Sequence, residues 1–521
     1  MAKLTTLVDL LEQRASAPRG YYIFVKDGVN ARRLDFPCLA RRAKAIAAQL
    51  QTQASPGGTA LLLYPPGLDF LVAFFACLYA GVVAVPLPSP ERGRAKRAQP
   101  RLRAIADDAD ASLILGPAAF SDELHHTIAD ASRQLRFFAT DAVEPSLASE
   151  WRMPTGGARE LAYLQYTSGS TTVPRGVMLT HANVLDNLEC FGRGMGYDAS
   201  SIEVTWMPHF HDYGLVAGLL HPLYRDIPAH ILPPLALIKQ PFQWLKTITE
   251  HRATHSHGPN FAYEICTQRV TEEQKDRLDL STWQTAGNGA EPVRADTLRR
   301  FADAFASCGF NANSFYPAYG LAEATLFVAA RRRGALYRTV LVCAQALAQG
   351  RVIHMGEAGA PDSSRLLVSC GVPDGFADLR IVDSETRTEC PPGRVGEIWF
   401  ASPSVASGYW SRAEETKAVF RAQVHDAPEA GPFLRTGDLG FLSGGELFVT
   451  GRLKDVIVIA GANHYPQDIE WSILSDCPEV RRDHCVAVAS DGDHSEQLVI
   501  LAEPERLQPD WSGLILSLIH I

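Results

Sequence analysis

Cysteine is scarce in this sequence and follows no metal-binding or redox pattern. Ten cysteines occur among 521 residues, and no two of them form a Cys-x-x-Cys pair. So few cysteines do not build a disulfide scaffold, and the lack of pairs excludes a zinc ribbon and a thioredoxin-type centre. We therefore expect a protein of the reducing cytoplasm.

Positive charge is also in short supply. The chain has 49 lysines and arginines against 58 aspartates and glutamates, which gives a formal net charge of −9. A protein that coats nucleic acid needs an excess of positive charge to neutralise the phosphates. The charge balance therefore argues against a nucleic-acid partner.

Long hydrophobic runs are almost absent. The exception is residues 70–87, FLVAFFACLYAGVVAVPL, which carries no charge and approaches the length of a membrane span. Gly81 and Pro86 interrupt this run, so we predict a buried helix over residues 68–80 and a short strand after it. The first residues space their apolar groups as a helix does, which predicts an amphipathic helix and no secretory signal. We expect no integral membrane association.

Short β-branched runs alternate with helical patterns through most of the chain, and 46% of its residues are hydrophobic. This alternation predicts an α/β fold of layered sheets and helices. We predict a large domain at 1–453 and a small, mobile α+β domain at 454–521, in which Pro466 begins a helix. The small domain ends in an apolar segment with no terminating signal, which we interpret as a C-terminally truncated, incomplete domain. Residues 348–365 lose periodicity and gain Gly, Pro and Ser, which predicts an inserted loop.

A cluster of hydroxyl side chains follows an expected strand in YTSGSTTVPRG, residues 166–176. Hydroxyls and backbone amides in a glycine-bearing turn form an anion-binding concavity, and the guanidinium of Arg175 can bind phosphate oxygens. The spacing is not that of a P-loop, since Pro174 follows Gly169 by five residues. A polar surface turn would have the same composition, so the loop alone leaves both interpretations open. The candidate phosphate ligands are Thr167, Ser168, Gly169, Ser170, Thr171 and Thr172.

Three later motifs place charged side chains in turns. Glu323, in YGLAEAT, follows an apolar and aromatic run and supplies the hard oxygen that Mg²⁺ prefers. Asp438, in the glycine-flanked turn RTGDLGF, suits the hydroxyls of a ribose, and GRLKD offers Arg452 and Lys454 at the predicted domain junction. Each group taken alone also fits an exposed surface charge. Their occurrence in this order favours a nucleotide site.

Together, YTSGST, PRG, MPHFHDYGL, NGAEPV, YGLAEAT, RTGDLGF and GRLKD resemble the motifs of the adenylate-forming superfamily of acyl and aryl ligases. Within it, LQYTSGST, GPNFAYEIC and NHYPQDIE resemble the fatty acyl-AMP ligases. The resemblance implies activation of a fatty acid by ATP and Mg²⁺ to an acyl-adenylate, with release of pyrophosphate. The acyl group would then pass to the phosphopantetheine thiol of an acyl carrier protein. The insertion at 348–365 lies where those ligases carry a segment that disfavours coenzyme A.

The resemblance also implies roles for the candidate residues at the reacting groups. The loop at 167–172 would grip the pyrophosphate end of ATP, with Arg175 on the same group. Glu323 would hold Mg²⁺. His211 would face the acyl carboxylate and the α-phosphate, and Lys454 would be the hinge of the small domain.

The remaining candidates are implied to bind the nucleoside. Asp438 would accept hydrogen bonds from the ribose hydroxyls, and Arg452 would support the ribose from the hinge side. The adenine pocket and the strands leading to it would comprise Asn288, Gly289, Ala290, Glu291, Tyr319 and Gly320.

The implied chemistry needs charge stabilisation rather than a dedicated base. A carboxylate with a pKa near ~4.3 is ionised at neutral pH and is its own nucleophile toward the α-phosphorus. His211 lies beside Asp212 and also fits a hydrogen-bonded structural residue. The pairs His209 with His211 and His255 with His257 lack convergent cysteines or carboxylates, so we expect no metal there.

Two features depart from the superfamily pattern. Thr172 and Arg175 occupy positions where glycine and lysine are usual, and no lysine follows Lys454, although the adenylation lysine of the superfamily lies late in the small domain. Loss of one preorganised charged donor costs about 10²–10³ in rate, so we expect slow adenylation from the chain as it stands. A fatty acyl-CoA ligase and a non-catalytic acyl-adenylate-binding protein remain as alternatives.

Overall fold

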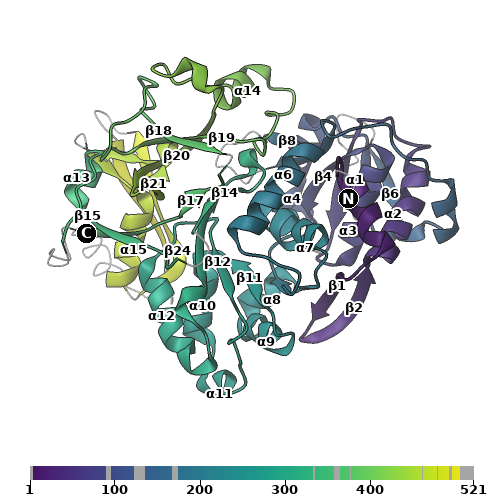
Figure 1. Ribbon diagram of the computed structural model, residues 1–521, viewed down its shortest axis with the longest axis horizontal. Helices are drawn as coiled ribbons and strands as arrows, with labels where there is room; N and C mark the ends of the chain where they lie inside the picture. The colour runs from purple at the N-terminus through teal and green to yellow at the C-terminus, as the bar shows by residue number, and fades with distance from the viewer. Residues whose placement is uncertain are drawn as a thin grey trace.

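The computed structural model describes residues 4–89, 95–121, 135–166, 174–331, 335–356, 364–375, 377–459, 462–477, 479–491 and 496–504. Over these residues the chain forms layered sheets and helices, as the alternating sequence pattern predicts (Figure 1). Two large sheets come first along the chain, and smaller sheets follow them.

The first large sheet has six strands in the order β6-β5-β3-β4-β7-β8. All its neighbouring strands are parallel except the antiparallel pair β7 and β8. The strands are β3 (Thr59–Tyr64), β4 (Val83–Pro88), β5 (Leu113–Gly116), β6 (Arg136–Ala139), β7 (Leu161–Tyr166) and β8 (Gly176–Thr180). The helices of this part are α1 (Leu7–Ser16), α2 (Phe36–Leu50), α3 (Leu68–Ala80), α4 (Ala95–Asp108) and α6 (His181–Gly194).

The uncharged run at residues 70–87 is part of this core, as predicted. Helix α3 ends at Ala80, Gly81 adopts a left-handed backbone with φ of 70°, and β4 begins at Val83. Glycine suits that position because a Cβ atom makes positive φ unfavourable. The described helices include none that is both long and apolar enough to cross a membrane. The N-terminal helix α1 begins after Thr6, whose side chain forms a capping box with Asp9.

The second large sheet has nine strands in the order β17-β14-β13-β12-β11-β9-β10-β1-β2. Strands β13, β12, β11, β9, β10 and β1 run parallel, so their carboxyl ends meet at one edge, where α/β sheets place their ligands. The strands are β1 (Tyr21–Lys26), β2 (Val29–Asp35), β9 (Glu203–Thr205), β10 (Ala229–Ile231), β11 (His255–Gly258), β12 (Thr285–Asn288), β13 (Phe315–Gly320), β14 (Phe327–Ala330) and β17 (Val372–Pro373). Its helices are α7 (His221–Arg225), α8 (Pro234–Lys239), α9 (Phe242–Glu250), α10 (Asn260–Arg269), α11 (Glu272–Lys275) and α12 (Ala295–Phe305).

A π-helix, η4 (Tyr213–Leu220), follows β9 and begins directly after His211 and Asp212. It packs closely on the end of β9 because it carries two glycines. A Cβ on Gly214 would lie 2.0 Å from the backbone oxygen of Pro208, and one on Gly218 would lie 2.6 Å from the Thr205 hydroxyl. π-Helical turns are rare and are often found at functional sites.

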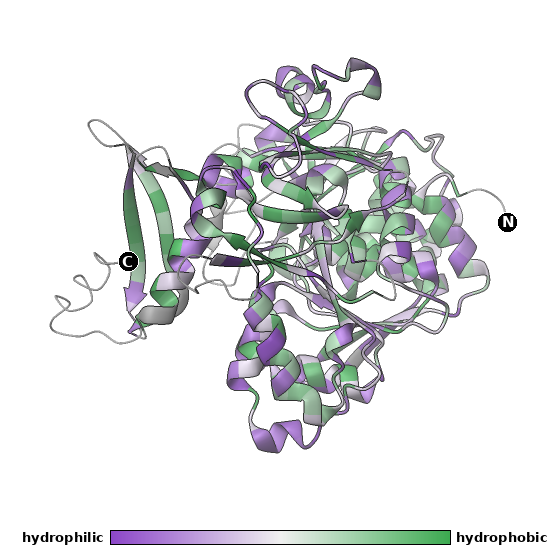
Figure 2. Cartoon of the chain, turned by 60° about the vertical axis from the view of Figure 1, so that its left-hand side comes forward, coloured by the Kyte–Doolittle hydropathy of each residue, from purple (hydrophilic) through white to green (hydrophobic). Residues whose placement is uncertain are grey.

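The later part of the chain forms smaller sheets. A four-stranded sheet contains β18 (Asp378–Val382), β19 (Gly396–Ala401), β20 (Leu434–Ser443) and β21 (Glu446–Arg452), with α14 (Ala413–Phe420) before β20. The segment after it contains β22 (Ile457–Ile459), β23 (Ala462–His464), α15 (Pro466–Asp476), β24 (Val480–Asp491) and β25 (Glu496–Pro504). Pro466 begins α15, as predicted. Figure 2 shows the strand pair next to the C-terminus standing apart from the main body.

The predicted insertion at 348–365 lies between two paired strands. Helix α13 (Ala344–Ala348) follows β15 (Thr339–Cys343), and β16 (Ser364–Val368) returns antiparallel to β15. Between them, His354 forms an isolated bridge with β15, and Arg351 forms one with Arg394. Residues 357–363 lie outside the described part of the chain. The predicted domain boundary at 453 and 454 falls within a short 3₁₀ turn, η10 (Leu453–Asp455).

Candidate active site

A cleft of about 1070 Å³ opens where the nine-stranded sheet, the end of the six-stranded sheet and the β20–β21 sheet meet. The predicted site residues that line it come from five separate regions of the chain. They are Arg175, His211, Gly289, Ala290, Tyr319, Gly320, Glu323, Arg452 and Lys454.

The backbone after β12 and β13 comes unusually close to neighbouring strands at this cleft. A Cβ on Gly320 would lie 1.9 Å from the Leu326 oxygen, and one on Gly289 would lie 2.9 Å from the Ala318 oxygen. Ala290 has a φ of 69°, a strained value for a residue with a side chain. These close backbone contacts fix the position of the peptide groups of Gly289, Ala290 and Gly320, which line the cleft.

Asp438 lies within strand β20 rather than in the predicted turn, directly after Gly437, whose φ of 72° bends the strand. Asp438 pairs with Arg452 of β21, is only 8% exposed, and adjoins the cleft-lining residues Thr436 and Gly437. The Tyr319 hydroxyl donates to Asp438 Oδ2 at 2.6 Å, and Arg452 Nε donates to Oδ1 at 3.2 Å. Burial raises the pKa of Asp438, while Tyr319 and Arg452 oppose the rise. A carboxylate has about four acceptor positions, so two such donors leave room for ribose hydroxyls.

The bend directly before Asp438 is fixed by Glu397, a buried residue of β19. Arg435 Nη2 lies 2.8 Å from Glu397 Oε2, and the indole of Trp399 donates to the same oxygen at 2.9 Å. The amide of Gly437 donates to Glu397 Oε1 at 3.2 Å. These contacts place the backbone just before Asp438.

Glu323 lies in the 3₁₀ turn η7 (Ala322–Ala324) after β13, and the Tyr409 hydroxyl donates to its Oε1 at 2.8 Å. Burial raises the pKa of Glu323, and the bond from Tyr409 opposes this rise. A carboxylate with one oxygen oriented by a tyrosine and facing a cleft fits a Mg²⁺ ligand, since this ion takes hard oxygens and retains several waters.

His211 lies just before η4 and contacts its neighbour Asp212. The Nδ1 atom of His211 is 2.6 Å from Asp212 Oδ1. Burial lowers the pKa of His211, but the Asp212 carboxylate raises it, and the net shift is upward. The ring is therefore oriented by Asp212 and favours the protonated form more than a free histidine does.

Arg175 lies at the mouth of the cleft, where its Nε is 3.0 Å from Glu415 Oε2 of α14. Its guanidinium lies 5.5 Å from the ring centre of Tyr409. Tyr409 thus touches both Arg175 and Glu323. The predicted phosphate ligands Thr167, Ser168, Gly169, Ser170, Thr171 and Thr172 lie outside the described residues.

Two predicted residues, Asn288 and Glu291, do not line the cleft. Side chains alternate along β12, so the amide of Asn288 points toward α10, where its Nδ2 lies 3.5 Å from Asn260 Oδ1. Glu291 Oε1 accepts a hydrogen bond from the Phe261 amide at 2.6 Å, at the start of α10. Asn288 ends β12, the strand that leads to Gly289 and Ala290, and the contribution of the exposed Glu291 to the adenine pocket stays a prediction.

Lys454 and Arg452 line the cleft at the predicted hinge, and α15 docks nearby on the large domain. Arg365 Nη1 lies 2.9 Å from Asp468 Oδ2, and the Arg294 guanidinium lies 4.4 Å from the Trp471 ring centre. These contacts hold the segment after η10 against α12 and β16.

A family model, a related protein and a solved structure all indicate the same family for this chain. The family model "AMP-binding enzyme" matches residues 11–410. The medium-chain-fatty-acid–[acyl-carrier-protein] ligase JamA of Moorena producens is 46% identical over 512 residues, which cover 97% of this chain and 86% of that protein. The crystal structure of a fatty acyl-adenylate ligase from L. pneumophila in complex with acyl adenylate and pyrophosphate is 38% identical, with a TM-score of 0.82, over 99% of this chain and 88% of that one.

The chain belongs to the AMP-binding enzymes and is a fatty acyl-AMP ligase. The predicted family and α/β fold are therefore confirmed. A 4-hydroxyphenylalkanoate adenylyltransferase of Mycobacterium tuberculosis is also similar, with 38% identity over 96% of this chain and 82% of that protein.

Sequence reasoning missed three groups of this ligase that position the predicted ones: Tyr409, Glu397 and Arg435. Tyr409 lies far from Glu323 in the sequence, and only the fold brings them together. Glu397 lies in GEIWFASPS, a segment whose β-type pattern predicts a strand. The charged residue inside an otherwise apolar strand was the available clue, because a buried carboxylate needs a partner.

The ligase also has an apolar wall in the cleft beyond His211. It consists of Phe191 from α6, Tyr213 from η4, and Leu326 with Phe327 at β14. These four side chains are all buried. They supply the apolar surface that a fatty acyl chain requires.

Proposed function

We propose that this ligase joins a fatty acid to AMP in its cleft and then passes the acyl group to the phosphopantetheine thiol of an acyl carrier protein. The observation that carries the proposal is the arrangement of the cleft. Glu323, Tyr409 and His211 line the cleft together with an apolar wall and with Arg452, which donates a hydrogen bond to Asp438.

The first half-reaction exchanges one bond for another at phosphorus. A carboxylate oxygen of the fatty acid bonds to the α-phosphorus of ATP, and the bond from that phosphorus to the pyrophosphate oxygen breaks. Tyr319, Gly289 and Ala290 would bind the adenine, and Asp438 would accept the ribose hydroxyls. These contacts fix the α-phosphorus relative to the apolar wall, and such positioning supplies much of the rate of phosphoryl-type transfer.

Charge stabilisation is the second requirement. His211, favoured in its protonated form by Asp212, would donate to the α-phosphate or the incoming carboxylate. Arg175 would release its ion pair with Glu415 and bind a pyrophosphate oxygen instead. Glu323 would hold Mg²⁺, which when bound neutralises phosphate charge.

In the second half-reaction the thiol of the carrier bonds to the acyl carbonyl carbon, and the bond from that carbon to the AMP oxygen breaks. The named function of the Moorena producens relative supports a carrier protein as the acceptor and a medium-chain acid as the substrate. The residues beside the hinge, Arg452 and Lys454, would face the departing AMP.

The test is formation of acyl-AMP from ATP and a fatty acid, followed by mass spectrometry, with a holo acyl carrier protein or coenzyme A added in parallel. We expect pyrophosphate release that depends on the fatty acid, and acyl transfer to the carrier. Transfer to coenzyme A in preference to the carrier would contradict the second half of the proposal. ATP binding with no acyl-AMP would contradict the first half.

A further inference from the structure

We propose that Phe191 sets the length of acyl chain that this ligase accepts, by closing the apolar arm of the cleft against a buried polar network. The inference rests on the proposed acyl-activating function and adds the residue that determines selectivity. It concerns a side chain that none of the sequence motifs contains.

Phe191 is the most enclosed part of the apolar wall. It is 2% exposed, yet its ring borders the cleft. Aromatic rings surround it, with centroid distances of 5.0 Å to His221, 5.5 Å to His257, 5.8 Å to Tyr197 and 5.9 Å to Phe327. A ring packed in this way cannot turn aside without displacing its neighbours, so it forms a fixed end wall.

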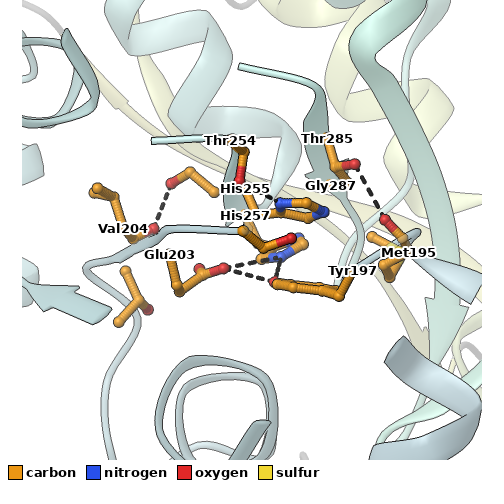
Figure 3. Close-up of polar contacts among 12 residues, drawn as sticks. Met195, Tyr197, Glu203, Val204, Thr254, His255, His257, Thr285 and Gly287 are labelled. Atoms are coloured by element: carbon orange, nitrogen blue, oxygen red, sulfur yellow. Dashed lines mark hydrogen bonds and ion pairs between the residues drawn. The ribbon is translucent and has the colours of Figure 1, made fainter. Parts of the chain in front are cut away.

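Tyr197 and His257, whose rings contact Phe191, form a polar network with Glu203. Figure 3 shows the side chains of this network. The Tyr197 hydroxyl lies 2.6 Å from Glu203 Oε2 and 2.6 Å from His257 Nε2. Gly287 makes space for this histidine, because a Cβ there would lie 2.1 Å from His257 Nδ1. All three network residues are buried.

The network presents polar atoms and is unsuited to contact with a hydrocarbon chain. Burial raises the pKa of Glu203 well above its usual value and lowers the pKa of His257 to about 3, so burial favours the uncharged form of each side chain. Glu203 Oε1, His257 Nδ1 and both ring nitrogens of His221 are buried without a hydrogen-bond partner among the described residues. A hydrocarbon chain that extended past Phe191 would contact buried polar atoms with which it cannot form hydrogen bonds. Each further methylene group would therefore make the binding free energy less favourable. The favourable apolar surface therefore ends at Phe191.

A second group of apolar side chains, Leu102, Ile105 and Val419, also lines the cleft, and we call it the second arm; Val419 lies on α14 with Glu415, the ion-pair partner of Arg175. An acyl chain placed there would be insensitive to Phe191. Because Arg175 is assigned to the departing pyrophosphate, we place the acyl chain in the arm beyond His211 instead. Val419 then offers a matched control, since it lines the other arm and is part-buried.

The test measures binding of acyl sulfamoyl adenosines with chains of eight to sixteen carbons, by calorimetry, to the wild type and to Phe191→Ala, Phe191→Leu and Val419→Phe. One methylene in a hydrophobic pocket changes selectivity by about tenfold or more. We expect the Phe191→Ala variant to shift the affinity ratio of fourteen- to ten-carbon analogues toward the longer chain by at least about tenfold. We expect a smaller shift in the same direction for Phe191→Leu, and none for Val419→Phe.

Phe191→Leu keeps most of the buried volume and provides the measurement if Phe191→Ala does not fold. An unchanged length preference in both Phe191 variants would overturn the inference, and a shift in Val419→Phe alone would place the chain in the other arm. If sulfamoyl adenosine binds the wild type at least as tightly as every acyl derivative does, the proposed function itself fails. That outcome differs from an unchanged length preference in the Phe191 variants, which overturns only the inference about Phe191.

Discussion

The two halves of the cleft are built in different ways. In the nucleotide half, each ionised group is positioned by a partner from another part of the chain, as Glu323 is by Tyr409 and Asp438 by Tyr319. In the acyl half, Phe191 is held by packing against aromatic rings, and burial raises the pKa of Glu203 in the polar network next to it. We therefore expect substitutions in the first half to change rate and those in the second to change selectivity or stability.

The largest effect is expected from Glu323→Gln. Glutamine keeps the shape and can still accept the bond from Tyr409, but it removes the charge that would hold Mg²⁺. We expect acyl-AMP formation to fall by about 10²–10³, with a weaker dependence on Mg²⁺ concentration. Glu414→Gln, at an exposed position of α14, is the control and should leave the rate unchanged. Equal losses in both variants would contradict the assignment.

Glu203→Gln tests the polar network and should affect stability rather than rate. Because burial raises the folded-state pKa of Glu203, the wild type must protonate this group on folding above about pH 4.5. The free energy of unfolding of the wild type therefore falls with rising pH, relative to that of the variant, by up to about 1.4 kcal/mol per pH unit. This fall extends from the pKa of Glu203 in the unfolded chain to its pKa in the folded protein. Urea midpoints of both proteins, measured upward from about pH 4.5, should diverge as pH rises. Parallel curves would show that Glu203 is ionised in the folded protein.

Tyr409→Phe removes the hydroxyl that opposes the rise in the pKa of Glu323. The ionised carboxylate is then less favoured, so activity should disappear at a higher pH on the acid side of the rate profile. Because a hydrogen bond to a charged group is lost, we expect the rate of the variant to be about tenfold lower near neutral pH. A uniform loss at every pH, with no displacement of the acid limb, would indicate a purely structural role for Tyr409.

Glu291→Gln should give the smallest effect. This side chain accepts a bond from the Phe261 amide and does not line the cleft. We expect the KM for ATP to stay within about twofold and the free energy of unfolding to fall by about 0.3–1 kcal/mol, the range for a carboxylate at a helix N-terminus. A large increase in KM would support the sequence-based assignment of Glu291 to the adenine pocket.

The sequence predicted the elements whose local pattern is strong. The helix and strand at residues 68–88, the N-terminal helix and the helix that begins at Pro466 all follow from apolar spacing and from glycine or proline at their ends. Glu323 and Asp438 could be proposed because motifs place them in glycine-rich turns. Local pattern suffices where a residue and its signal lie together.

The same reasoning could not identify partners that are distant in sequence. Tyr409 and Glu323 are 86 positions apart, and Tyr197 and His257 are 60 positions apart. It also assigned Asn288 to the site because a motif contains it, although strand alternation turns its amide toward α10. Direction of a side chain across a sheet depends on register, which the motif does not specify.

The central claim is that one cleft binds the nucleotide and the acyl chain on either side of His211. The most direct test compares the affinities of sulfamoyl adenosine, a fatty acid and the acyl sulfamoyl adenosine that joins them, measured by calorimetry on the wild-type protein. We predict that the joined compound binds at least about 10²-fold more tightly than either part, because linkage makes the second contact intramolecular. Equal affinity of the joined compound and sulfamoyl adenosine would show that the cleft holds no acyl chain and would contradict the account.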